Sequence, residues 1–259
     1  MTIDQIIQQS LNAHKEGRLE EAEKLYLKVL QTHPLHAATN HNLGVIALSK
    51  NKIEFALSFF KAAIKAKGLK EIKTLESDEL ISITASLLAD KKIIAWFQGG
   101  AEFGPRALGN RSYLADPRDD KIRDEINKKI KKRELFRPFA PSVTVEDAHR
   151  FFCISQDSPF MNIVSGVKSD FVPAITHIDN TARIHTVSKE SNFLYHKLIT
   201  EFGKITGVPV LLNTSFNIQE PIVYSPEDAL QTFIKSGVDA LVIGPFIIKR
   251  GDIPKGLML

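Results

Sequence analysis

The sequence predicts a mixed α+β protein, with an all-helical N-terminal part followed by an α/β domain. Two observations lead to this fold class. Residues 1–68 repeat themselves at an offset of 34 residues, with small and aromatic residues recurring at fixed steps. From about residue 93 onward, short apolar runs alternate with helical segments, as is typical of a domain in which helices pack on a sheet.

The N-terminal repeat indicates helical hairpins. The recurring positions are Ala13 with Ala47, Gly17 with Asn51, Ala22 with Ala56, Tyr26 with Phe60, and Pro34 with Gly68. A 34-residue period with this pattern resembles the tetratricopeptide repeat, or TPR. We therefore expect two TPR units over 1–68, with helices near 3–16, 19–32, 37–50 and 53–66. Such repeats need about three units to bury a continuous core. We therefore expect the pair to pack against the downstream domain or against a protein partner.

The rest of the chain predicts the second domain. Residues 69–76 should form a linker or helical extension, residues 77–250 the α/β domain, and residues 251–259 a tail. Ser77 is the expected N-cap of a helix near 78–90. Strands are expected at 93–97, 172–178, 182–187, 208–213 and 240–249. Further helices are expected near 119–132, 145–152, 190–206 and 226–236.

The composition is that of a soluble globular protein, with 43% hydrophobic and 25% charged residues. No run of about 18 apolar residues predicts a membrane span, and the N-terminus lacks the pattern of a secretory signal. The one cysteine, Cys153, cannot form an internal disulfide and is expected to be a core thiol in a reducing compartment. We therefore expect a cytoplasmic protein.

The net charge is concentrated in one segment. The chain has 34 Lys and Arg against 30 Asp and Glu, a net charge of +4, and residues 117–137 carry 9 basic against 5 acidic groups. The excess in this segment equals the total. No basic patch interleaved with aromatic residues is present, as single-stranded nucleic acid binding would require. The charge therefore favours a local anion site over a nucleic-acid surface.

The first candidate ligand segment is WFQGGAEFGPRALGNRS, residues 96–112. Glycines, including Gly104, follow an apolar strand here, and glycine lets backbone N–H groups approach an anion. Arg106 and Arg111 offer planar guanidinium groups suited to phosphate oxygens. The segment is neither a P-loop nor a GxGxxG motif. The alternative is a glycine-rich connection carrying two surface arginines.

The second segment is KIRDEINKKIKKRELFRPFAP, residues 121–141. Ile122, Ile126 and Ile130 form one apolar stripe and predict an amphipathic helix. A solvated charged face explains most of the lysines. It does not explain the prolines around Arg137, which stiffen the chain and so fix where this guanidinium points.

The third segment is THIDNTARIHTV, residues 176–187. His177 and Asp179 alternate along an expected strand, so both could face one pocket with Arg183 nearby. The pair could be half of a metal site, an acid/base pair, or a hydrogen-bonded pair across a turn at Asn180. We predict no metal site from it.

The fourth segment is LLNTSFNIQEPIV, residues 211–223. An apolar strand ends in Asn213, Thr214 and Ser215, and ligands of α/β sheets tend to bind at such strand ends. The alternative is a capped turn, because all three are turn-forming residues.

These four segments, in this order, resemble the C-terminal domain of the nodulation- and antibiotic-type O-carbamoyltransferases. The matching strings are EFGPRALGNRS, KxRExFRPFAPS, ITHIDNTAR and PVLLNTSFN…EPIV, which together span roughly 77–250. The resemblance implies a YrdC-like fold. It also implies an enzyme that converts carbamoyl phosphate and ATP, with Mg²⁺, to carbamoyl-adenylate, releasing phosphate and pyrophosphate. In the family, a separate actin/sugar-kinase-like domain then passes the carbamoyl group to a hydroxyl, using a bound metal.

The resemblance also implies roles for individual residues. Arg106 and Arg111 would hold phosphate groups, Lys131 and Arg137 the carbamoyl phosphate, and Arg183 would add a further cation. The catalytic residues would be Arg106, Lys131, Arg137 and Arg183. The substrate-binding residues would be Gly104, Arg111, His177, Asp179, Asn213, Thr214 and Ser215.

The sequence departs from the family in three places. Ala101 stands where a larger residue is usual, and Asn180 replaces a usual glycine. The transferase domain is absent from this sequence and the TPR pair stands in its place. We therefore expect the activating half-reaction, with a protein partner recruited through residues 1–68, and neither a membrane nor a nucleic acid partner. The alternative is a non-catalytic TPR interaction protein whose C-terminal domain is degenerate or senses a ligand.

Overall fold

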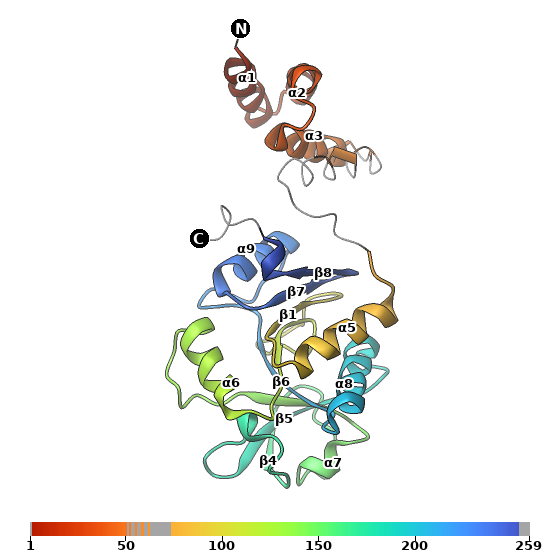
Figure 1. The fold of residues 1–259 in the computed structure, drawn as a ribbon, viewed down its shortest axis with the longest axis vertical. Coiled ribbons are helices and arrows are strands. Elements are labelled where there is room, and N and C mark those ends of the chain that lie inside the picture. Colours follow the sequence, from red (N-terminus) through yellow and green to blue (C-terminus); the bar gives the residue numbers. More distant parts are fainter. Residues whose placement is uncertain are drawn as a thin grey trace. The chain divides into compact units, whose positions relative to one another are not determined.

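The computed structural model describes residues 2–50, 52, 55, 58–59, 62 and 74–253. The chain divides into two compact units, formed mainly by residues 1–71 and 72–251. The first unit contains helices α1 (Ile3–Lys15), α2 (Leu19–Thr32) and α3 (Ala37–Ser49) (Figure 1). These bounds agree with three of the predicted helices to within one residue at each end. The predicted helix 53–66 and linker 69–76 fall largely outside the described residues.

The packing of α1–α3 follows from the residues that recur in the sequence. Ala13, Ala22 and Tyr26 are fully buried and form a cluster with Leu43 and Ile46. Small residues at the first two positions let the helices approach each other, and the Tyr26 ring occupies the space between them. The described helices fit a helical repeat, while the TPR assignment stays a prediction.

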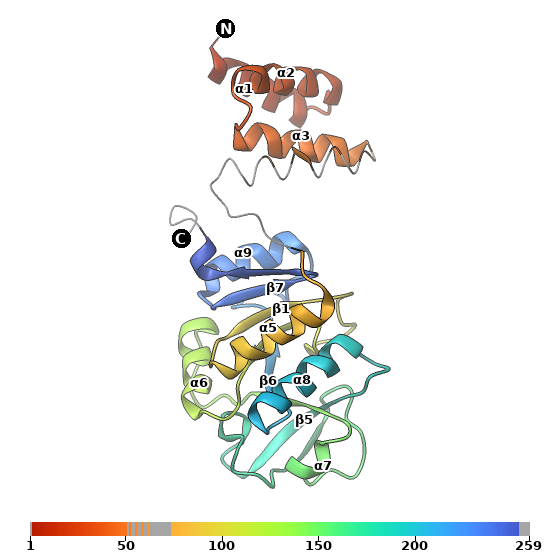
Figure 2. The same ribbon diagram turned by 45° about the vertical axis from the view of Figure 1, so that its right-hand side comes forward.

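The second unit is built on a mixed sheet of eight strands within residues 74–253, in the order β4-β5-β3-β6-β2-β1-β7-β8. Figure 2 labels β5, β6, β1 and β7, which follow one another in this order. The strands are β1 (Ile94–Phe97), β2 (Arg111–Ala115), β3 (Ala140–Thr144), β4 (Ile163–Gly166), β5 (Thr181–Val187), β6 (Val210–Ser215), β7 (Ala240–Ile243) and β8 (Phe246–Lys249). The pairs β1–β7 and β3–β5 are parallel, and the other neighbours are antiparallel. The mixed α+β class is confirmed, while the YrdC-like description stays a prediction.

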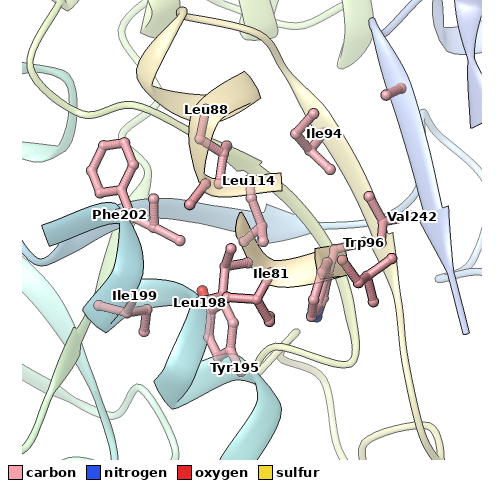
Figure 3. Close-up of a cluster of buried hydrophobic side chains, with 14 of the residues drawn as sticks. Ile81, Leu88, Ile94, Trp96, Leu114, Tyr195, Leu198, Ile199, Phe202 and Val242 are labelled. Atoms are coloured by element: carbon pink, nitrogen blue, oxygen red, sulfur yellow. The ribbon is translucent and has the colours of Figure 1, made fainter. Parts of the chain in front are cut away.

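The main core lies between the sheet and two helices, α5 (Ser77–Ala89) and α8 (Phe193–Thr206). Figure 3 shows Leu88 from α5 and Phe202 from α8 in the same buried cluster as the strand residues Ile94 and Leu114. Trp96 is fully buried in this cluster, and its indole N–H donates to the carbonyl of Gly109 at 2.8 Å. The core therefore supports the loop between β1 and β2, which begins directly after this strand.

The remaining described helices of this unit are short, apart from α9. They are α6 (Asp120–Glu125), the π-helical turn Ile126–Ile130, α7 (Ala148–Phe151), the 3₁₀ turn Pro173–Ile175, α9 (Pro226–Ser236) and the 3₁₀ turn Arg250–Asp252. Helix α9 has the bounds that the sequence predicts, 226–236; Ser225 forms a capping box before it and Pro226 lies in its first turn.

Several predictions of local structure are wrong. Residues 172–178 do not form a strand, because Pro173 starts a 3₁₀ turn and residues 177–180 form a further turn. Ser77 is the first residue of α5 rather than its N-cap, a position occupied by Glu76 without a side-chain hydrogen bond. The predicted helix 119–132 changes to a π-helical turn after Glu125. Strands β2, β3 and β4 were not predicted.

Two further predictions bear on the class of protein. None of the helices in the described part of the chain is long and apolar enough to cross a membrane. Cys153 is exposed rather than buried in the core, because the two preceding residues, Phe151 and Phe152, are the ones whose rings are buried.

Candidate functional site

The glycine-rich segment forms the loop between β1 and β2, and a carboxylate of its own holds it in shape. Oε1 of Glu102 accepts hydrogen bonds from the backbone N–H groups of Leu108, Asn110 and Arg111, at 2.7, 2.8 and 3.2 Å. We expected backbone N–H groups of this loop to face a bound anion. These three groups instead face an internal anion, which stabilises the loop.

The two arginines of the loop have different environments. Arg111 is buried, and its guanidinium lies 3.5 Å from the ring centroid of Phe97. Its terminal nitrogens donate to the carbonyls of Gln98 at 2.8 Å, Asn110 at 3.0 Å and Gly99 at 3.1 Å. Arg106 is exposed and makes no hydrogen bond within the described part of the chain. Arg111 therefore supports the loop, whereas Arg106 has its donors free for a ligand.

Lys131 is a buried cation at the end of the π-helical turn. Its side-chain nitrogen donates to the carbonyl of Ser215 at 2.6 Å and to the carbonyl and Oδ1 of Asn217 at 2.9 and 2.7 Å. Burial, with a smaller contribution from Arg133, lowers the pKa of Lys131 to about 7. The charge of Lys131 therefore responds to pH near neutrality, and a bound anion would favour its protonated form.

Two cavities of about 320 Å³ each are lined by residues of this region, and Lys131 lines the second of them. The first is lined by Arg133, Arg137, Pro138, Phe139, Val164, His177 and Arg183. The second is lined by Lys131, Arg133, Arg137, Ser215, Asn217, Ile218 and Gln219. Arg133 and Arg137 line both, so the two cavities share a cationic wall.

Arg183 extends from β5 into the first cavity. Its Nε is buried and has no hydrogen-bond partner in the described residues. Burial, and to a lesser degree the charge of Arg106, lowers the pKa of Arg183. Because the two arginines repel each other, a bound anion between them would be stabilising.

His177 and Asp179 do not alternate on a strand as expected. They lie in a turn in which the Asn180 N–H donates to the carbonyl of His177 at 2.9 Å, and Asn180 has a φ of 62°. Oδ1 of Asp179 accepts from the backbone and hydroxyl of Thr181, at 3.1 and 2.7 Å. His177 lines the first cavity, whereas exposed Asp179 does not. The turn needs a residue that tolerates positive φ, which explains glycine or asparagine at position 180.

Asn213 is buried beside the cavities in a polar network. Its Nδ2 donates to the carbonyl of Ala107 at 3.0 Å and to Oγ of Ser142 at 2.9 Å. Oγ of Ser142 also lies 2.8 Å from Nδ1 of His185. Burial lowers the pKa of His185 to about 4, which favours a neutral imidazole. Oδ1 of Asn213 is buried and has no hydrogen-bond partner among the described residues.

The structure thus brings together part of the predicted site. Lys131, Arg137, His177, Arg183 and Ser215 line the two cavities. Arg106 is close enough to Arg183 to affect its pKa. Gly104, Arg111, Asp179, Asn213 and Thr214 line neither cavity.

Sequence reasoning missed Arg133 and Asn217. The KxRE string contained Arg133, but the surrounding lysines made it resemble a solvated helix surface. The described residues contain no group of three or more His, Cys, Asp or Glu side chains that could hold a metal ion.

Comparisons with known proteins show which family the second unit is similar to. The family model described as "Carbamoyltransferase C-terminus" matches residues 85–250. Nodulation protein NolO of Bradyrhizobium diazoefficiens is 50% identical over 181 residues, which cover 67% of this chain and 33% of the relative. Nodulation protein NolNO of Sinorhizobium fredii is 52% identical over 180 residues, which cover 67% and 26%.

A third relative is named as an enzyme. The 3'-hydroxymethylcephem-O-carbamoyltransferase of Amycolatopsis lactamdurans is 37% identical over 182 residues, covering 70% of this chain and 34% of the relative. The chain therefore spans about a third or less of the length of these relatives.

Proposed function

The chain belongs to the carbamoyltransferase C-terminus family, and we propose that its second unit carries out the activating half of an O-carbamoyltransferase reaction. In this reaction, water cleaves carbamoyl phosphate to carbamate and phosphate. An oxygen of the carbamate then attacks the α-phosphorus of ATP and expels pyrophosphate, leaving carbamoyl-adenylate. ATP enters as its Mg²⁺ complex, and the phosphate oxygens can carry that ion.

The observation that carries this proposal is the pair of adjoining cavities with a shared cationic wall. Two anionic substrates must meet without mutual repulsion, and Arg133 and Arg137 border both cavities. Lys131 adds a cation to one cavity and Arg183 to the other. Phosphoryl transfer depends mainly on positioning and on cations directed at phosphate oxygens. This donor set supports that chemistry.

The end of β6 supports the same reaction. Ser215 lines the second cavity, whereas Asn213 is buried two residues earlier and lines neither cavity. We propose that Ser215 contacts the carbamoyl or phosphate moiety directly, and that Asn213 supports this strand end through its hydrogen bonds to Ala107 and Ser142.

The first unit has a separate proposed role. We propose that α1–α3 recruit a protein partner, for example a separate transferase domain that would complete carbamoyl transfer. Leu27, Leu35 and Val45 are exposed apolar residues on or next to these helices, which favours this idea.

The test is ATP–pyrophosphate exchange, which detects reversible adenylate formation. Labelled pyrophosphate should enter ATP only when carbamoyl phosphate is present, and Arg137→Ala should reduce the rate at least tenfold because it removes a cation common to both cavities. Arg150→Ala is the matched control, because Arg150 is an exposed arginine paired with Asp147 on α7, and it should leave the rate unchanged. No exchange in the purified chain, with or without an added transferase domain, would contradict the proposal.

A further inference from the structure

Arg133 is held in a fixed position between the two cavities. Its Nε donates to Oδ1 of Asn127 at 2.7 Å, and its guanidinium lies 4.8 Å from the ring centroid of Phe139. Its backbone N–H donates to the carbonyl of Asn127 at 3.0 Å. The terminal nitrogens make no hydrogen bond within the described residues, although Arg133 lines both cavities. Its free donors therefore face the space where ligands would bind.

Asn127 determines the course of the chain that carries these arginines. It is fully buried in the π-helical turn. Its Nδ2 donates to the carbonyls of Leu135 and Arg137, at 3.2 and 2.9 Å, while its Oδ1 accepts from Arg133. Carbonyls can only accept, so this arrangement fixes the orientation of the amide. One buried side chain thus connects both ends of the segment 133–137.

The π-helical turn explains why Asn127 can reach this segment. The backbone N–H of Lys131 donates to the carbonyl of Ile126 at 2.8 Å, five residues earlier. A π-helical turn contains more residues than an α-helical turn, and such turns are frequent at functional sites. Here Asn127 and Lys131 are buried together with Ile126 and Ile130. The chain then reverses at Lys132, with a φ of 47°, and returns Arg133 to Asn127.

The charges around Arg133 favour a bound anion. The nearby guanidinium of Arg137 repels Arg133 and, with burial as the larger cause, lowers its pKa. Glu134 pairs with Arg137, with a 3.6 Å separation between the charged atoms. Arg133 has no carboxylate within ion-pair distance in the described part of the chain. A phosphate group would supply the missing acceptors for its planar donors.

We propose that Arg133 binds phosphate groups of both substrates from the wall between the two cavities, and that Asn127 is the residue that positions it. This inference rests on the proposed function, because it takes carbamoyl phosphate and ATP as the two ligands. It assigns a substrate-binding role to Arg133 and a positioning role to Asn127 through the hydrogen bond between them.

The experiment measures the Kd of ATP and of carbamoyl phosphate separately, by calorimetry, in the full chain. Arg133→Gln should raise both Kd values by about 10- to 100-fold, as expected for loss of a charge-assisted hydrogen bond. Arg133→Lys keeps the charge but not the planar donors, so it should recover only part of the affinity. Arg123→Gln is the control, since Arg123 pairs with its neighbour Asp124 and lines neither cavity.

A double-mutant cycle separates positioning from a general loss of structure. Asn127→Ala should weaken both ligands in the wild-type background, but most of that effect should disappear in the Arg133→Gln background. Should Asn127→Ala fail to fold, Phe139→Leu removes the ring beneath the same guanidinium and can replace it in the cycle. Thermal unfolding of each variant shows which of them are folded.

The possible outcomes distinguish this inference from the proposed function. If the wild type binds both ligands and Arg133→Gln changes neither Kd by more than twofold, this inference is overturned and the proposed function stands. A change for one ligand alone overturns the shared role. Additive effects in the cycle overturn the role of Asn127. If the wild type binds neither ligand, both proposals are overturned.

Discussion

We predict that the affinity of the second cavity for a phosphate ligand depends on pH through the ammonium group of Lys131. Burial lowers the pKa of Lys131 to about 7 in the free protein. A group with that pKa is about 90% protonated at pH 6 and about 10% protonated at pH 8. If the second cavity binds a phosphate mainly when Lys131 is charged, the Kd should rise about tenfold between these pH values, or about 1.4 kcal/mol.

The assay is calorimetric titration of freshly dissolved carbamoyl phosphate at several pH values from 6 to 8. The ligand has its own titration in this range, so the Lys131→Met variant serves as the reference. This variant should bind more weakly at pH 6 and should show only the pH dependence of the ligand. The wild type and the variant should converge toward pH 8.

The lowered pKa of Lys131 also makes the stability of the folded protein depend on pH. The pKa of Lys131 lies below the unfolded value of 10.5, so the unfolded chain binds more protons between pH 7 and 10.5. The stability of the wild type should therefore rise with pH in that window, by about 2 kcal/mol from pH 7 to 9 relative to Lys131→Met. Equal slopes in the two proteins, in binding and in unfolding, would refute the reasoning.

Three further predictions concern the stability of the second unit, measured by urea unfolding with the fluorescence of Trp96, the single tryptophan. Glu102→Ala should lower the free energy of unfolding by about 2–4 kcal/mol, because three loop N–H groups lose their acceptor. Glu102→Gln keeps one oxygen and should lower it by about half as much. Equal losses for the two variants would contradict this explanation. Gly109→Ala should cost more than about 3 kcal/mol, because its Cβ would lie 2.1 Å from Tyr195 at a φ of +95°. Gly207→Ala, at a φ of +77° with nothing within 4 Å, should cost only about 1–2 kcal/mol. Ile126→Ala, in the fully buried first position of the π-helical turn, should cost about 2–5 kcal/mol and Ile126→Val about 1 kcal/mol; losses below 1 kcal/mol for both would mean that the turn is not packed as described.

Local sequence patterns predicted the elements whose structure depends mainly on residues within the same short segment. Helix α9 has the predicted bounds, and the capping box of Ser225 and the Pro226 that start it lie within one short segment. The stripe of Ile122, Ile126 and Ile130 is buried as its spacing indicates. Strands β2 and β3 were not predicted because Arg111, Ser112, Pro141 and Ser142 interrupt their apolar pattern. Arg111 and Ser142 are buried through hydrogen bonds to residues outside their own strands, Gln98 and His185.

The candidate site, too, contains some residues that the sequence identified and others whose role only the folded structure shows. The sequence singled out Arg137, Arg183 and Ser215, because guanidinium and hydroxyl groups near prolines and strand ends are typical of anion sites. It could not separate Arg106 from Arg111. Arg111 directs its donors to the carbonyls of Gln98 and Gly99, and only the folded loop shows which arginine keeps its donors free.

The charge excess at 117–137 was visible in the sequence alone. The same segment contains Lys131, Arg133 and Arg137, which line the cavities, while its role as an anion site stays a prediction. The sequence by itself therefore determined the helical periodicity, the order of the motifs and through them the family. Only the tertiary structure decided which cations line the cavities, because burial and hydrogen bonds to distant residues control where each side chain points. The π-helical turn that brings Asn127 to Arg133 is the clearest case, since an α-helix would satisfy the same isoleucine spacing.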